Sequence, residues 1–338
     1  MSGPFRWIAA GIGAAALLCA VACSHTPSST PGAASGAPGA APGGLTSDGT
    51  AVAAPSPAVG PAAPAPDTTG GFDGARAYKN VQELVAFGPH PAGSDAIHRT
   101  QAYILEQLKS SNCPVEEQDF HASTPVGDVA MKNIIVKIPS ANPNIILYAS
   151  HYDTKRIPDF VGADDGGSST GVLLELARLL CARKNAENIW LAFLDGEEAV
   201  NMQWVDPDNT YGSRELAASI ALSGTLPRLK AMILVDMIGP YDPVFNRELN
   251  STPWLTNIVW STASRLGYGN VFVNQTAMIE DDHLPFLKRH VASTDLIDLD
   301  VPYWHTTRDT IDKIDPRSLA ITGHVLVESL PAIEQKIR

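Results

Sequence analysis

The chain has 338 residues, with 24 basic and 36 acidic side chains and a formal charge of −12. This charge balance excludes a protein that binds nucleic acid through a net basic surface. Hydrophobic residues make up 44% of the chain and charged residues 18%, so most of it can bury a core and does not have the composition of a disordered protein.

The N-terminal segment is predicted to be a targeting signal. Residues 7–22 form an apolar run that is too short and too rich in Ala and Gly to favour a membrane span. The run ends in Ala20-Val21-Ala22-Cys23-Ser24, which resembles the lipobox of bacterial lipoproteins. We therefore expect residues 1–22 to be a lipoprotein-type signal peptide and Cys23 to carry the lipid of an exported, membrane-anchored protein of a bacterial cell envelope. Cleavage without lipidation, which would give a periplasmic or secreted protein, is the alternative.

A linker is expected next. Residues 23–70 are dominated by Pro, Gly, Ala and Ser, and their only charged side chains are Asp48 and Asp67. Such a segment cannot bury enough apolar surface to offset its chain entropy, which predicts a disordered tether. The remaining residues, 71–338, have the size of one domain.

Short apolar runs then alternate with helical patterns. The expected strands are Asn133–Ile138, Asn144–Ser150, Ile189–Leu194, Ala231–Val235, Val271–Val273 and Ser293–Ile297. Apolar residues recur at helical spacing over Ser168–Ala182 and Pro316–Ile337. Long crossovers between apolar strands predict an α/β fold with a mixed, largely parallel central sheet and helices on both faces.

Polar side chains follow three of these strands. His151 follows the second strand, Glu197 and Glu198 lie just after the third, and Asp236 follows the fourth. Because open α/β sheets bind ligands beyond the carboxyl ends of their strands, we expect these side chains to meet in one crevice. A single Asp after a strand is usually a turn or cap residue, and a single His is usually structural. Two adjacent glutamates are harder to explain in this way, since their carboxylates repel unless a cation or a shared proton relieves them.

The crevice is predicted to hold a metal ion. Five residues offer the imidazole and carboxylate ligands that a catalytic Zn²⁺ takes, namely His151, Asp165, Glu198, Asp236 and His305.

Seven motifs occur in a recognisable order. They are SHYDTK (150–155), GADDGGSSTGVLLELARLL (162–180), FLDGEEA (193–199), TYGSREL (210–216), LVDMIG (234–239), IEDDHLPFL (279–287) and YWHTTRDTID (303–312). Together they resemble the glutaminyl-peptide cyclotransferase family, a branch of the zinc-dependent aminopeptidase fold, and the resemblance covers residues 73–338.

The resemblance implies roles for individual residues. Asp165, Glu198 and His305 are expected to hold a single zinc ion, and Glu197 is expected to be the acid/base that shuttles the proton. Asp236 and Asp281 match a pair of acids that form a hydrogen-bond network behind Glu197, and they complete the predicted catalytic set.

The same resemblance outlines the substrate pocket. Trp204 and Trp304 match its aromatic walls, and Ile279 and Glu280 are expected to line it near the substrate amine. One departure from the family lies behind the pocket, where Asp295 stands in place of a His found in the vertebrate members.

The implied activity converts an N-terminal Gln of peptides or proteins into pyroglutamate and releases ammonia, with zinc polarising the amide carbonyl. An exported aminopeptidase with two zinc ions is the alternative, with His151 and Asp236 as ligands of the second ion. Trp204, Trp304 and the IEDDHLPFL motif favour the cyclotransferase. A binding protein without activity would need damaged ligands, and none is damaged.

The expected partners are peptides with an N-terminal Gln. We expect no binding of nucleic acid, membrane contact only through the lipid, and a monomeric chain. The sequence does not decide whether Cys113 and Cys181 pair.

Overall fold

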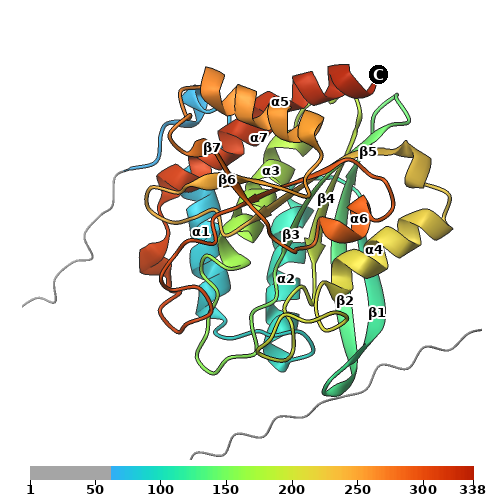
Figure 1. Ribbon diagram of the computed structural model, residues 1–338, viewed down its shortest axis with the longest axis vertical. Helices are drawn as coiled ribbons and strands as arrows, with labels where there is room; N and C mark the ends of the chain where they lie inside the picture. Colours follow the sequence, from blue (N-terminus) through green and yellow to red (C-terminus); the bar gives the residue numbers. More distant parts are fainter. Residues whose placement is uncertain (1–61) are drawn as a thin grey trace, which may run out of the picture. The chain divides into compact units, whose positions relative to one another are not determined.

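The computed structural model describes residues 62–338 (Figure 1). The predicted signal peptide, Cys23 and the predicted tether up to residue 61 lie outside this range. Within it, Pro66–Thr68 forms a short 3-10 helix, η1, and the Thr69 hydroxyl donates to the Phe72 carbonyl at 2.6 Å. Regular structure therefore starts a few residues before residue 71. No helix within residues 62–338 has both the length and the apolar character needed to cross a membrane.

A six-stranded sheet forms the centre of the domain, in the order β1-β2-β4-β3-β5-β8. Its strands are β1 (Val115–Thr124), β2 (Gly127–Ile138), β3 (Ile145–His151), β4 (Asn188–Leu194), β5 (Leu229–Asp236) and β8 (Ser293–Ile297). The neighbours β4, β3, β5 and β8 run parallel, whereas β1 and β2 are antiparallel additions at one side. The mixed, largely parallel sheet is confirmed.

Helices cover both faces of this sheet (Figure 1). The helices are α1 (Gly74–Ala86), α2 (Asp95–Lys109), α3 (Gly167–Cys181), α4 (Tyr211–Leu222), α5 (Pro253–Arg265), α6 (Leu284–Leu287) and α7 (Pro316–Ile337). Successive strand residues point to opposite faces. Accordingly, Ile146 and Tyr148 of β3 pack in the core that contains α1, α3 and α7, while Ile145 and Leu147 pack with α4 and α6. Burial on both sides explains why β3 is a continuous apolar run.

Two strands differ from the prediction. The sequence of β1, VEEQDFHAST, is mostly polar and exposed, so hydrophobic patterning missed it; it is an edge strand, paired with β2 from Val115↔Val136 to Thr124↔Gly127. The segment predicted as strand Val271–Val273 becomes β7 (Phe272–Ala277), which pairs with β6 (Phe245–Glu248) in a separate two-stranded sheet. Most side chains of β7 are exposed or half-buried, which does not suit a strand covered on both faces.

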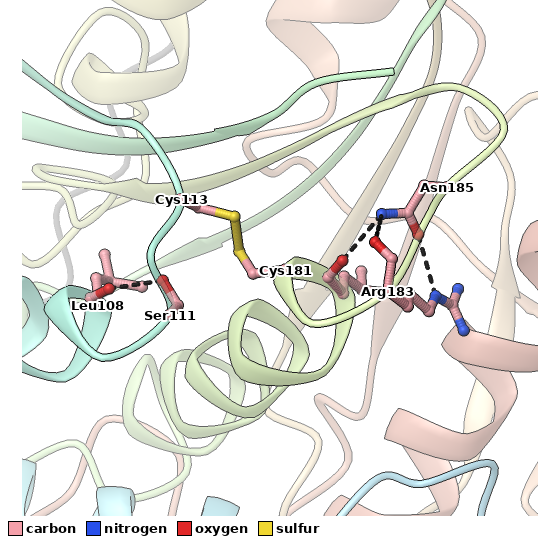
Figure 2. Close-up of a disulfide and its surroundings, with 7 residues drawn as sticks. Leu108, Ser111, Cys113, Cys181, Arg183 and Asn185 are labelled. Carbon is pink, nitrogen blue, oxygen red and sulfur yellow. Dashed lines mark hydrogen bonds between the residues drawn. A yellow bond between two sulfur atoms is a disulfide. The ribbon is translucent and has the colours of Figure 1, made fainter. Parts of the chain in front are cut away.

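Cys113 and Cys181 form a disulfide, with their Cα atoms 6.0 Å apart (Figure 2). The bond joins the loop before β1 to the last residue of α3. Just beyond the helix, the Asn185 side-chain amide donates to the Leu180 carbonyl at 2.9 Å and closes the turn. The end of α3 is thus fixed on two sides.

Candidate metal and catalytic site

The ends of three neighbouring parallel strands form the floor of the site. His151 is the last residue of β3 and lies opposite Leu194, the last residue of β4. Asp236 is the last residue of β5, on the other side of β3. The parallel register brings these strand ends together, as we expected from the sequence.

Asp165, Glu198 and His305 make the first candidate metal group. His305 Nε2 lies 3.4 Å from Asp165 Oδ2 and 3.3 Å from Glu198 Oε1, and the three ligand atoms lie within 4.8 Å of one another. Asp165 Oδ2 and Glu198 Oε1 are buried without a hydrogen-bond partner. Buried polar atoms normally have partners, so these oxygens are arranged for a cation.

The spacing fits zinc. A tetrahedral zinc ion with bonds of about 2.0–2.1 Å to N and O ligands keeps neighbouring ligand atoms about 3.3 Å apart. Two of the three distances in this group have that length, and imidazole nitrogen and carboxylate oxygen are both zinc ligands, three of which make up the protein part of a catalytic site.

His305 is held in an uncommon backbone conformation. Its φ is +50°, in the left-handed region that non-glycine residues rarely adopt. Trp304 stacks on the His305 ring with centroids 4.3 Å apart, and Phe160 meets the ring edge-on at 6.1 Å. A strained residue persists where its surroundings fix it, often at functional sites. These two aromatic contacts orient the imidazole.

Asp309 ties the His305 loop to the Asp165 loop. Its carboxylate accepts the peptide N–H of Asp164 at 2.8 Å and that of Asp165 at 3.1 Å. The two ligand-bearing loops are therefore fixed relative to each other by one buried side chain. Asp309 lies within the motif YWHTTRDTID (303–312), but its place in that motif does not predict this role.

Asp153 positions the two adjacent glutamates, a role that was not predicted from the sequence. It is 1% exposed, and its two carboxylate oxygens accept the peptide N–H groups of Glu197 at 3.0 Å and Glu198 at 3.3 Å. The backbone that presents both glutamates is thereby fixed to the loop after β3. The only sequence signal was its place in the SHYDTK motif.

Glu197 and Glu198 have different surroundings. Both side chains line one cavity, but Glu198 Oε1 lies 3.3 Å from His305 Nε2, whereas the Glu197 side chain lies 3.8 Å from His151 Nδ1 and makes no hydrogen bond within the described residues. Burial raises the pKa of the Glu197 carboxyl well above its ordinary value; His151 opposes this rise, and Glu198 and Asp281 add to it. A carboxyl with a raised pKa beside a cavity is suited to acid/base chemistry.

The charges of the first group favour a bound cation. Burial disfavours the imidazolium of His305, but the neighbouring carboxylates of Asp165 and Glu198 raise its pKa to about 9. Burial raises the pKa of Glu198 as well, and Asp165 adds to that rise. Two buried carboxylates thus share one imidazole, and the excess negative charge attracts a proton or a metal ion.

His151, Asp165 and Asp236 form a second group within 4.8 Å. His151 Nε2 lies 3.1 Å from Asp236 Oδ1 and 3.3 Å from Asp165 Oδ1. Asp236 Oδ1 also accepts the Met237 N–H at 2.8 Å. Asp165 belongs to both groups, because its Oδ2 faces His305 in the first group and its Oδ1 faces His151 in the second. The structure therefore brings together the residues expected to bind one zinc ion and also those expected to bind a second ion in the aminopeptidase alternative.

Gly166 allows this close packing. Its φ is +81°, and a Cβ at this position would lie 2.8 Å from Cε1 of His151. A side chain here would push α3 away from the His151 ring, so the loop that carries Asp165 needs glycine at its end.

A cavity of about 330 Å³ opens beside the first group. The three predicted catalytic residues Glu197, Asp236 and Asp281 line it. So do all four predicted substrate-binding residues, namely Trp204, Ile279, Glu280 and Trp304. Met202 and Met278, both more than half exposed, also line it, and sequence analysis did not name them. Small-molecule sites usually occupy about 300–1,000 Å³, so this cavity suits a single amino-acid residue.

The acids behind the cavity are only partly connected. Asp281 accepts the Asp282 N–H at 2.5 Å, while its other oxygen is buried without a partner. Within residues 62–338 no hydrogen bond joins Asp236, Asp281 and Glu197. Asp295 is fully buried with neither oxygen hydrogen-bonded, and burial together with Asp281 raises its pKa well above the ordinary value.

Comparisons with known proteins agree with this geometry. Residues 133–330 match the profile of Peptidase family M28. The glutaminyl-peptide cyclotransferase of Drosophila melanogaster is 32% identical over 257 residues, which cover 67% of this chain and 72% of the fly protein. The solved glutaminyl cyclase of an Acidobacteriales bacterium is 37% identical with a TM-score of 0.75, covering 84% of this chain and 100% of that one. A Zn-dependent exopeptidase from Parabacteroides distasonis is 28% identical with a TM-score of 0.71, covering 77% of this chain and 98% of that one.

Proposed function

The chain belongs to the glutaminyl cyclase family within peptidase family M28, and we propose that Glu197 and one zinc ion carry out its reaction in the cavity described above. The protein is a glutaminyl-peptide cyclotransferase, and its substrates are peptides with an N-terminal Gln. The observation that carries the mechanism is the pair of adjacent glutamates at the cavity: Glu198 faces His305 of the metal group, and the Glu197 side chain makes no hydrogen bond within residues 62–338.

The reaction closes a ring within the substrate. The α-amine of the N-terminal Gln attacks the carbon of its own side-chain amide, so one C–N bond forms, one breaks, and ammonia leaves. Glu197 accepts a proton from the attacking amine and delivers it to the departing nitrogen. Its raised pKa, caused mainly by burial, suits it to hold that proton between the two steps.

Asp165, Glu198 and His305 are the proposed zinc ligands. When bound, zinc supplies a Lewis acid for the amide oxygen of the substrate. The support is the ligand spacing of 3.3–3.4 Å around His305 and the two oxygens at that spacing, Asp165 Oδ2 and Glu198 Oε1, which are buried without a hydrogen-bond partner. In this proposal His151 does not bind the metal, because its Nε2 is engaged by Asp236 at 3.1 Å.

The walls of the cavity hold the substrate folded. A Gln side chain is flexible, and closing it into a ring needs the amine and the amide carbon held in contact. Trp204 and Trp304 supply apolar walls for this, and Glu280 offers a carboxylate for the amine.

One assay separates this proposal from the two-zinc aminopeptidase. The cyclotransferase releases ammonia from a Gln-initiated peptide and releases no amino acid from a Leu-initiated one. It loses turnover on chelation, regains it with zinc, and contains one zinc ion per chain. Release of free leucine together with two tightly held zinc ions would favour the aminopeptidase, which the second group around His151 would then serve.

We also propose that the protein is exported and anchored through a lipid on Cys23. The disulfide between Cys113 and Cys181 supports export, since such bonds persist mainly in oxidising compartments. Replacing Cys23 with Ser should move the protein from the membrane fraction to the soluble exported fraction, with Cys19→Ser as the matched control. Unchanged fractionation of Cys23→Ser would contradict the lipid anchor.

A further inference from the structure

Lys155 is a buried cation at the edge of the metal group. It lies in the loop after β3, its side chain is 1% exposed, and it lines the catalytic cavity. Its Nζ lies 3.3 Å from Glu198 Oε2, and no other acid in residues 62–338 forms an ion pair with it. Lysine is almost never fully buried without a partner, so this pair accounts for its position.

The two oxygens of Glu198 therefore face different groups. Oε1 lies 3.3 Å from His305 Nε2, on the side of the metal group, and Oε2 lies 3.3 Å from Lys155 Nζ. The peptide N–H of Glu198 is held separately by Asp153. With its backbone and both carboxylate oxygens placed, the side chain has one orientation.

We propose that Lys155 is a positioning residue that holds Oε2 and so limits Glu198 to binding zinc through Oε1. The inference rests on the proposed function, because it concerns the zinc ion placed there. A catalytic zinc ion has three protein ligands and keeps a further position for substrate or water. If Oε2 also reached the metal, Glu198 would fill that position and exclude the amide oxygen of the substrate.

Lys155 also weakens zinc binding. Its ammonium and the metal carry charges of the same sign in a buried site, where repulsion between charges is strong. The pair with Glu198 further reduces the negative charge available to the metal. Lys155 thus lowers affinity for zinc and keeps the bound ion open to substrate, and these two effects are measurable separately.

The test is Lys155→Met in the full chain, which keeps the length of the side chain and removes its charge. Zinc affinity is measured by competition with a chromogenic chelator, and kcat and KM are measured with a Gln-initiated peptide at saturating zinc. We expect the zinc dissociation constant to fall by about tenfold or more, because the like charge is gone. We expect kcat to fall by about tenfold or more while KM stays within about twofold, since the contact of the amide oxygen with the metal acts mainly in the transition state and the cavity walls hold the bound substrate.

Two further variants make the result decisive. Lys137→Met is the matched control, because Lys137 pairs with Glu116 at 2.5 Å between β2 and β1, away from the cavity; it should leave all three constants unchanged. Lys155→Gln replaces the methionine variant if thermal unfolding shows that Lys155→Met does not fold, and it should also bind zinc more tightly.

Several outcomes overturn the inference. Zinc affinity that is unchanged or weaker shows that Lys155 does not oppose metal binding, and an unchanged kcat shows that it does not keep the site open. A raised KM with normal kcat shows that Lys155 contacts substrate instead. If the unmodified chain releases no ammonia from the peptide, the proposed function fails, whereas the comparison of zinc affinities still decides the role of Lys155.

Discussion

Replacing Glu197 with Gln should abolish proton transfer while leaving the metal group intact. The Glu197 side chain makes no hydrogen bond within residues 62–338, and its nearest charged partner is His151 Nδ1, 3.8 Å from Oε2. The amide of Gln has the same shape, and the change breaks no hydrogen bond of the side chain. Stability should therefore change by less than about 1 kcal/mol.

The expected loss is confined to the chemical step. A positioned acid/base group contributes about 10²–10⁴ in rate, which corresponds to about 3–5 kcal/mol in the barrier. We expect kcat to fall by that factor with little change in KM, because the proton moves mainly in the transition state. The pH–rate profile should also lose the limb due to Glu197, whose pKa is raised by burial.

Glu198→Gln is the matched control at the neighbouring position. Both oxygens of Glu198 are buried and face Lys155 and His305, so its amide variant should lose zinc affinity. Ammonia release and zinc content are measured for both variants. Near-normal kcat of Glu197→Gln with full zinc would refute the mechanism, and loss of zinc from that variant would mean that the two glutamates have exchanged roles.

Two further predictions concern stability. Replacing Cys113 and Cys181 with Ser removes a cross-link spanning 68 residues, which should lower the free energy of unfolding by about 4 kcal/mol in denaturant titrations; a loss below about 1 kcal/mol would contradict the chain-entropy account. Burial opposes the charged form of Glu248, but its hydrogen bonds, led by that from His283, lower its pKa from 4.5 to about 2. Its contribution to stability is therefore present above about pH 4.5 and lost as pH falls towards 2, and Glu248→Gln should flatten the unfolding free energy over that interval.

The position of the site could be predicted from the sequence because strand topology determines it. Apolar runs that are followed by His151, Glu197 and Asp236 identify parallel strands whose carboxyl ends meet at one edge. That inference needs only the order of the elements and their patterning. The edge strand β1 could not be predicted in this way, because its residues are mostly polar and show no apolar pattern.

The positioning residues could not be predicted in this way, because their roles depend on contacts between distant segments. Asp153 accepts N–H groups from residues 44 and 45 positions away, and Asp309 reaches Asp165 across 144 positions. Lys155 and Glu198 follow β3 and β4, and the pairing of these strands brings them together. Each of these side chains is ordinary in sequence and acquires its role through tertiary structure.

The number of metal ions depends on the charge at His151. Its Nδ1 lies 3.1 Å from the Asp153 carbonyl and its Nε2 lies 3.1 Å from Asp236 Oδ1, so both ring nitrogens face acceptors. A neutral imidazole donates only one N–H and cannot satisfy both acceptors. If Nδ1 donates to the Asp153 carbonyl, Nε2 carries either a second proton or a metal ion. A second zinc ion must therefore displace a proton that His151 otherwise holds.

This competition predicts how many zinc ions the chain binds at neutral pH. Burial opposes the imidazolium, but Asp236 and Glu197 raise the pKa of His151 well above its ordinary value. The proton should therefore remain at neutral pH, and the chain should bind one zinc ion there even with zinc in excess. Titrating the chain with zinc near neutral pH while recording proton release tests this directly. Uptake of two equivalents near neutral pH, the second with release of a proton, would show that the metal displaces the proton, and the site would then have the composition of the aminopeptidase alternative.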